Sequence, residues 1–319
     1  MKNTIFYRNL KITASVLALV FTVVACEKEY IPDLATTNDD VVVEGYIESG
    51  RNAAPPFVIL TKGIPFFREI ANTNNLFIKG AEIWVSNGKD SIQLTQFCWQ
   101  DLSPALRKQA GRTFNIQTDS VPKDFNFCVY LDLTQRLMGE VGKTYSLRIK
   151  TAEGKILTAQ TTIPRTVPID SALFIKPPGT NNLDTMAQMR AYVTDPKGAD
   201  FYRYFTSVNG SGYIAGRTSV TDDAFFEGIS TKFNLFKSEP RNSSTNPDIY
   251  GLFRRGDTIS IKFCSLDQAH FRFWQTLEFN ANNGGPFSSY TRVKHNINGG
   301  LGIWGGYNAT YYDAIVPKL

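Results

Sequence analysis

Histidine is scarce in this sequence, which contains only His270 and His295 among 319 residues. Two histidines are too few for most histidine-based zinc sites, and a few scattered cysteines do not replace them. The sequence also lacks the G-x-S-x-G, H-E-x-x-H and C-x-x-C patterns of serine hydrolases, zinc proteases and thiol sites. We therefore expect a protein that is not an enzyme and that holds neither a metal nor a cofactor.

A long apolar run is missing as well. The longest one, Ile12–Val24, contains polar interruptions and is shorter than the about 20 apolar residues that a membrane-spanning helix needs. Three cations precede this run and Ala25-Cys26 closes it, which is the order of a secretory signal whose last small residue abuts a cysteine. This arrangement resembles a lipobox, so we expect cleavage after Ala25 and a covalent lipid on Cys26. The three cations are Lys2, Arg8 and Lys11.

Clustered positive charge is absent too. The formal net charge is +5, but the signal carries three cations and no acids, so the mature chain is left with +2. The pairs Arg254-Arg255 and Lys294-His295 are isolated in the sequence. Nucleic acids and anionic lipid surfaces both select concentrated basic patches. The charge pattern therefore argues against either of them as a partner.

Cysteine is limited to four residues, and lipidation of Cys26 leaves Cys98, Cys128 and Cys264. An odd number outside the cytoplasm allows at most one intramolecular bridge. Cys98 and Cys128 fall in the same half of the chain, so they are the favoured pair. The alternative, three free thiols, stays open.

Short apolar stretches separated by Gly and Pro predict an all-β protein. In one of them, Ile83 and Val85 alternate with polar or exposed positions, and Asn87-Gly88 is typical of a type I′ turn into a return strand. Seven or so strands at this spacing predict an immunoglobulin-like β-sandwich over residues 41–166.

Four segments follow from these patterns. Residues 1–25 form the signal peptide, 26–40 a tether, 41–166 the β-sandwich domain, and 167–319 a second β-rich domain. One short helix is expected in the second domain, over Asp267–Phe279. Asp267 can cap its N-terminus, and apolar residues recur at three- and four-residue spacing.

Two motifs have residue types found at ligand sites. Gly300–Gly305 matches the dinucleotide-binding pattern letter for letter, but strand-like residues follow where that motif needs a helix. We interpret it as a place where backbones approach closely. Asp222-Asp223 offers too few oxygens for calcium and is interpreted as a solvated loop tip.

Aromatic residues make up 13% of the chain and supply the candidate contacts for a partner or a ligand. Such rings are enriched in protein interfaces and also stack on sugars. For Trp304 and Tyr307, filling the core of the second domain is the competing interpretation. The candidates are Trp84, Trp99, Phe287, Tyr290, Trp304, Tyr307, Tyr311 and Tyr312.

The chain contains several short motifs that occur in the same order in a known group of proteins. It resembles a family of Bacteroidota lipoproteins defined by a domain of unknown function, over nearly the whole mature chain. Members are typically encoded beside TonB-dependent receptors, and the family offers no established catalytic residues. The resemblance is carried by residues 26–30, 32–33, 42–45, 60–61, 65–67, 161–164, 169–171, 256–258, 273–274, 285–287 and 298–307.

The resemblance implies a non-catalytic accessory partner of a TonB-dependent receptor in nutrient uptake. Its expected place is the outer membrane, lipid-anchored and exposed at the cell surface. A surface carbohydrate-binding module is the alternative from another class, and a structural or adhesive envelope protein is a third. Binding to a soluble glycan without any receptor would distinguish the second hypothesis from the first.

Overall fold

The structure of the chain is a computed structural model that describes residues 40–63, 76–113, 116, 121, 125–179, 183–240, 246–282 and 291–318. Strands account for 47% of the described residues and helices for 12%, which confirms the predicted all-β class with little helix. Asn38–Leu319 forms one compact unit. Within the described residues, no helix combines the length and the apolar character that crossing a membrane requires.

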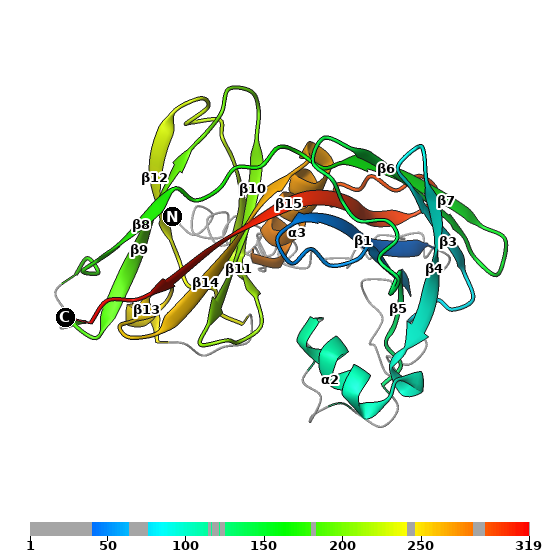
Figure 1. Cartoon of the computed structure of the whole chain (residues 1–319), viewed down its shortest axis with the longest axis horizontal. Coiled ribbons are helices and arrows are strands. Elements are labelled where there is room, and N and C mark those ends of the chain that lie inside the picture. The colour runs from blue at the N-terminus through cyan, green and yellow to red at the C-terminus, as the bar shows by residue number, and fades with distance from the viewer. Residues whose placement is uncertain are drawn as a thin grey trace, which may run out of the picture. The chain divides into compact units, whose positions relative to one another are not determined.

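A sheet of eleven strands forms the larger part of this unit (Figure 1). Neighbouring strands in it are antiparallel except for the first and the last strand of the chain, which pair in parallel from Val42 opposite Leu301 to Gly50 opposite Ala309. Across the sheet, the order is β11 (Ile214–Asp222), β10 (Phe201–Val208), β14 (Thr258–Leu266), β15 (Leu301–Ile315), β1 (Val41–Gly50), β2 (Phe57–Lys62), β5 (Cys128–Leu131), β4 (Ser91–Cys98), β3 (Glu82–Ser86), β6 (Thr144–Lys150) and β7 (Ile156–Thr162).

The sheet curls so that β7 returns to β15. Thr158 forms a β-bridge with Asn298, and the Thr161 hydroxyl accepts a hydrogen bond from the Gly306 N–H at 2.6 Å. Alternate residues of the curled strands point inward and form a first apolar core. Its members include Val43, Leu60, Ile83, Leu147, Leu157 and Trp304.

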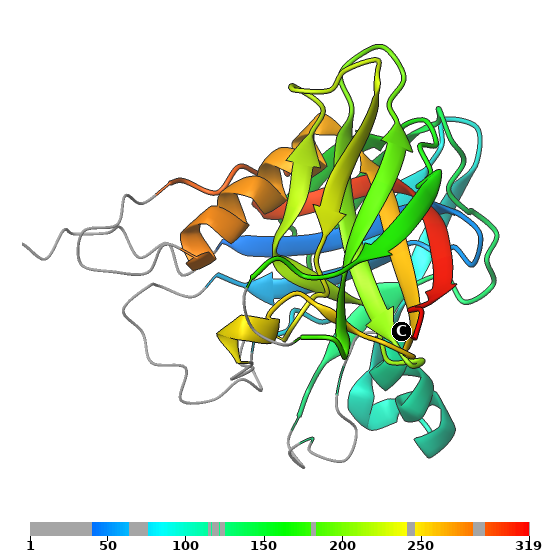
Figure 2. The ribbon, with the colours of Figure 1, turned by 90° about the vertical axis from the view of Figure 1, so that its left-hand side faces the viewer.

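A second core lies between β10, β14 and the end of β15 on one side and a smaller sheet on the other. Figure 2 views the smaller sheet from its outer side. Buried residues of β9 and β14, such as Met189 and Phe263, meet between the two layers. The smaller sheet contains β8 (Ser171–Ile175), β9 (Met186–Thr194), β12 (Ser230–Leu235) and β13 (Phe253–Arg254).

Strand β15 belongs to both cores. Trp304, near its start, is fully buried in the first core, and Tyr312 and Ala314 pack against the second. Its pairing with β1 joins the last strand of the chain to the first (Figure 1). Hydrogen-bonded strands connect the parts before and after the division predicted between residues 166 and 167, and that division stays a prediction.

The predicted hairpin is present, but its turn differs from the expected type. Ile83 pairs with Leu94, and both are buried, so the alternating apolar residues of the two strands face the core. The loop has four residues, 87–90, and among the first two only Gly88 has a positive φ, of 89°. The Asn87 side chain instead accepts hydrogen bonds from the N–H groups of Lys89 and Asp90, at 3.0 and 2.7 Å. A side-chain-capped loop thus replaces the type I′ turn.

The predicted helix is confirmed as α3 (Gln268–Asn282). Asp267 caps it, since its carboxylate accepts a hydrogen bond from the His270 N–H at 2.7 Å. The helix packs against β10, β11 and β15. A second helix, α2 (Pro104–Thr113), was not expected. Ser103, which accepts a hydrogen bond from the Leu106 N–H, and the proline at the first helical position were the signals for it.

Cys98 and Cys128 lie directly opposite each other on β4 and β5, and a disulfide joins them. Trp99 follows in a short 3-10 helix, η2 (Trp99–Asp101), and packs edge-to-face on Phe125. Cys264 is the remaining described cysteine, and it is free and buried.

Candidate functional site

A groove of about 1190 Å³ opens on one face of the large sheet, and we name it the central groove. Strands β1, β10, β14 and β15 supply its floor, and α3 supplies one side. Its rim also includes Asn52, Ala54, Phe57, Lys108, Gly111, Ile116 and residues 210–213. Side chains on one face of adjacent strands are neighbours, so Glu48 meets Tyr307 and Lys262 meets Tyr311 across the strand pairs.

Glu48 is the centre of a polar network in the floor of the groove. Its side chain is 4% exposed, and one oxygen lies 2.8 Å from the ammonium nitrogen of Lys262. The hydroxyls of Tyr307 and Tyr311 donate to its two oxygens at 2.9 and 3.4 Å. Three donors from β14 and β15 therefore compensate one buried carboxylate from β1.

The pKa values of Lys262 and Tyr307 are both raised in this network. Burial acts to lower the pKa of Lys262, but the acidic groups around it, led by Tyr307 and including Cys264 and Glu48, raise that pKa overall. Burial raises the pKa of Tyr307 well above its usual range, and the charge of Glu48 adds to this effect. At neutral pH, Lys262 is thus charged and Tyr307 keeps its proton for donation.

A second buried pair holds α3 on the sheet. Arg203 of β10 lies 3.7 Å from Glu278 of α3, and its Nε donates to the Ser219 hydroxyl at 2.9 Å. The Ser219 N–H donates to Glu278 at 2.8 Å, and the Ser219 hydroxyl donates to the same carboxylate. The Arg203 guanidinium also stacks on the Trp274 ring, 3.5 Å from its centroid. Trp274 and Glu278 are one helical turn apart, so one face of α3 makes both contacts.

Two ring nitrogens on α3 lack a hydrogen-bond partner among the described residues, His270 Nε2 and Trp274 Nε1. His270 is 2% exposed, and its Nδ1 lies 3.5 Å from the Gly306 carbonyl. The Tyr46 ring packs against His270 at 5.3 Å between centroids, and its hydroxyl lies near Trp274 Nε1 but outside hydrogen-bond geometry. Burial, assisted by the charge of Arg203, lowers the pKa of His270 to about 3, so the imidazole is neutral.

Glycines of β15 allow the close approach of the His270 side chain and of the β1 backbone. A Cβ on Gly305 would lie 2.7 Å from His270 Nδ1, and a Cβ on Gly302 would lie 1.9 Å from the Val43 carbonyl oxygen. The Gly300–Gly305 segment is thus a close approach of backbone and side chains on a strand.

The structure places the predicted aromatic residues in several different surroundings. Tyr307 and Tyr311 come together in the central groove. Trp304 is 0% exposed, and its indole N–H donates to the Tyr145 carbonyl at 3.1 Å. The Tyr312 hydroxyl accepts a hydrogen bond from the Ala172 N–H at 3.1 Å, so its ring lies between the two layers of the second core. The C-terminal aromatic segment is therefore not one surface patch.

The other predicted contacts are dispersed as well. Trp99 is 6% exposed and belongs to an aromatic cluster, which corrects its assignment as a contact residue. Trp84 is 37% exposed on β3, away from the groove residues. Cys26, Phe287 and Tyr290 lie outside the described residues.

Sequence reasoning missed most of the central groove. Glu48 and Arg203 are far from Lys262 and His270 in the sequence, and the topology of the sheet brings them together. The available signal was a polar residue inside an apolar strand, such as Lys262 between Ile261 and Phe263.

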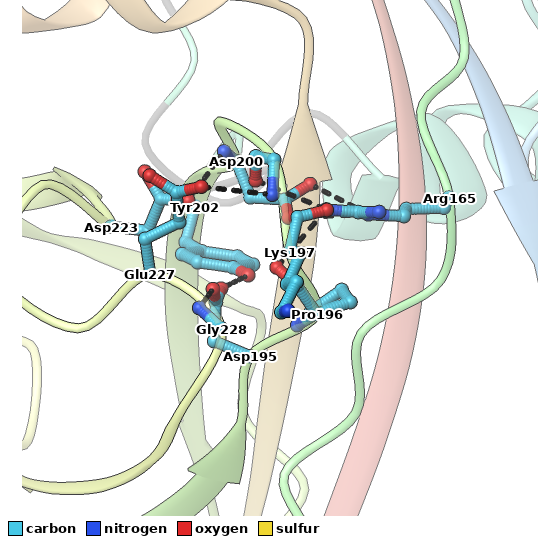
Figure 3. Close-up of polar contacts among 10 residues, drawn as sticks. Arg165, Asp195, Pro196, Lys197, Asp200, Tyr202, Asp223, Glu227 and Gly228 are labelled. Carbon is cyan, nitrogen blue, oxygen red and sulfur yellow. Dashed lines mark hydrogen bonds and ion pairs between the residues drawn. The ribbon is translucent and has the colours of Figure 1, made fainter.

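Three aspartates form a second polar cluster, at one end of the second core (Figure 3). Asp195, Asp200 and Asp223 are all buried, and one oxygen of each lies within 4.8 Å of the others. Asp223 is thus no solvated loop tip, which corrects the interpretation from sequence. Burial raises its pKa, and the nearby Asp195 and Asp200 contribute to this shift.

Arg165 supplies the positive charge at this cluster. Its Nε lies 3.2 Å from both oxygens of Asp200, and its Nη2 donates to the carbonyls of Lys197 and Gly198 at 2.8 and 3.0 Å (Figure 3). Asp195 accepts from the Tyr202 hydroxyl and from the Gly228 N–H. These partners all belong to the chain itself, so we interpret the cluster as a structural feature that holds the β9–β10 connection in place.

The comparisons with known proteins agree with one part of the resemblance, a family defined by a domain of unknown function. No curated protein matches the chain. The model of the family described as "Domain of unknown function (DUF4249)" matches residues 27–313, which include nearly all the strands and both helices described above. The chain therefore belongs to the DUF4249 family.

Proposed function

We propose that this protein is a lipid-anchored, non-catalytic binding protein of the outer membrane that assists a TonB-dependent receptor in nutrient uptake. The central groove carries the binding role, because it is large enough for an organic ligand and contains fixed, paired polar groups. The signal that ends at Ala25, directly before Cys26, and the family resemblance support the anchor, the cell surface and the receptor.

The protonation states in the groove favour holding a ligand over transforming one. An efficient general acid or base has a pKa near the working pH, whereas His270 has a pKa of about 3. Burial raises the pKa of the Cys264 thiol to about 12, which keeps it protonated and poorly nucleophilic at neutral pH. Lys262 and Arg203 each lie beside a carboxylate.

An apolar loop tip offers a contact for the receptor. Phe225, between β11 and β12, is 97% exposed, and Ile229 in the same connection is 55% exposed. A partner that covers the phenylalanine ring would gain about 1.5–3 kcal/mol from its burial. Aromatic anchors of this kind dominate the binding energy of many interfaces.

Crosslinking in intact cells, followed by gentle solubilisation, tests the proposal. We expect the full-length protein to co-purify with an outer-membrane receptor. Phe225→Ser should reduce the captured receptor at least several-fold, whereas the matched surface change Ile315→Ser should not, because Ile315 is exposed on another element. Cys26→Ala should move the protein out of the membrane fraction, since the lipid needs that thiol.

Two results would contradict the proposal. One is a wild-type protein that purifies without any receptor after crosslinking. The other is a Cys26→Ala protein that keeps its membrane partition and is still processed after Ala25.

A further inference from the structure

We propose that the central groove holds a neutral oligosaccharide as its cargo. This inference rests on the proposed role as a binding protein and names the ligand class of the same site. It follows from the charge balance of the groove, its place on the sheet, its aromatic faces and two unpartnered ring nitrogens.

The charges around the groove cancel. Two carboxylates and three cations line the groove, a third carboxylate from outside the lining pairs with one of these cations, and His270 is neutral. A strongly anionic or cationic ligand would therefore meet no net complementary charge. The carboxylates are those of Glu44, Glu48 and Glu278, and the cations are Lys108, Arg203 and Lys262.

The position of the groove disfavours an extended peptide. Peptides that bind to sheets usually add a strand at a free edge, where backbone N–H and C=O groups are unpaired. The groove floor instead lies inside the sheet, where β14 and β15 have hydrogen-bonded strands on both sides.

The side chains on the floor match hydroxyl groups. A sugar hydroxyl both donates and accepts hydrogen bonds, so it fits a surface where donors and acceptors alternate closely. The Lys262 ammonium, the Glu48 carboxylate and the Tyr311 hydroxyl provide such a surface within one network. Next to it, the rings of Tyr311 and the exposed Tyr213 lie 5.8 Å apart and offer apolar faces to the C–H side of a sugar ring.

The two unpartnered nitrogens point to the same ligand class. Neutral His270, with Nδ1 facing the Gly306 carbonyl, presents an acceptor at Nε2, and Trp274 presents a donor at Nε1. Both residues line the groove, four positions apart on one helix, so their side chains lie on the same face. Both nitrogens are shielded from solvent, with the Tyr46 ring packed against His270. A shift of Tyr46 would let neighbouring hydroxyls of one sugar satisfy the donor and the acceptor.

Calorimetry on the detergent-solubilised full-length protein tests the inference. The probes are neutral tri- to hexasaccharides of glucose, mannose and galactose, with uronate oligosaccharides and hexapeptides as comparison ligands. We expect binding of a neutral probe only. Trp274→Phe keeps a ring over Arg203 but loses the N–H, and it should weaken binding about tenfold, which corresponds to about 1.4 kcal/mol. Trp84→Phe, the matched change outside the groove, should leave the affinity unchanged.

Tyr311→Phe provides a second variant, because it removes one hydroxyl at the groove and keeps the ring. It should weaken binding about two- to fivefold without lowering the melting temperature by more than a few degrees. Preferred binding of peptides or uronates, or an equal loss in Trp84→Phe, would overturn the inference. Absence of any glycan binding by a wild-type protein that still captures a receptor would overturn the cargo class and leave the proposed function standing.

Discussion

At the scale of single residues, the ion pair of Glu48 and Lys262 shows how this fold tolerates charge inside a sheet. Each charge lost its hydration when the strands paired, and each regained partners from neighbouring strands. Such a pair adds little net stability by itself, but removing one partner leaves the other buried without compensation.

Lys262→Met tests this asymmetry. The change leaves the Glu48 carboxylate buried without a cation, so we expect the free energy of unfolding to fall by about 3–5 kcal/mol. The double variant Glu48→Gln with Lys262→Met removes both charges and should recover most of that loss. Urea denaturation of the three proteins measures it. A single variant as stable as the wild type would show that water already solvates Glu48.

At the scale of elements, sequence patterns predicted the features that depend only on residues close together in the chain. Alternation located the strand of Ile83 and Val85 and its return strand, and the Asp267 cap with helical spacing located α3 within a few residues. The parallel pairing of β1 and β15 was beyond such reasoning, because it joins residues more than 250 positions apart. Helix α2 was missed because it has few apolar residues to mark a buried face.

The disulfide between β4 and β5 gives the prediction at this scale. The two cysteines are 30 positions apart, so the bridge should contribute about 3–4 kcal/mol in the chain-entropy model. We expect Cys128→Ser to lower the unfolding free energy by about that amount and to abolish a mobility shift on non-reducing gels. Cys264→Ser, the matched change at the free thiol, should keep the shift. Three titratable thiols in the unfolded, unreduced protein would contradict the bridge.

At the scale of the whole molecule, the candidate site is a product of topology. Polar residues within single strands were visible in the sequence, but which of them share a groove depends on the strand order. The same strand order places residues of β15 in both cores. In addition, Arg165 in the connection from β7 to β8 binds the connection from β9 to β10.

Because β15 belongs to both cores, we expect the described unit to unfold cooperatively. Loss of either core would release β15, which the other core needs for Trp304 or for Tyr312. We expect one calorimetric transition whose van't Hoff enthalpy equals the measured enthalpy. Trp304→Phe in the first core and Phe253→Leu in the second should each lower the midpoint of that one transition, because both remove fully buried volume. If the two variants instead shifted two separate transitions, the cores would be independent, and the division predicted near residue 166 would describe two folding units.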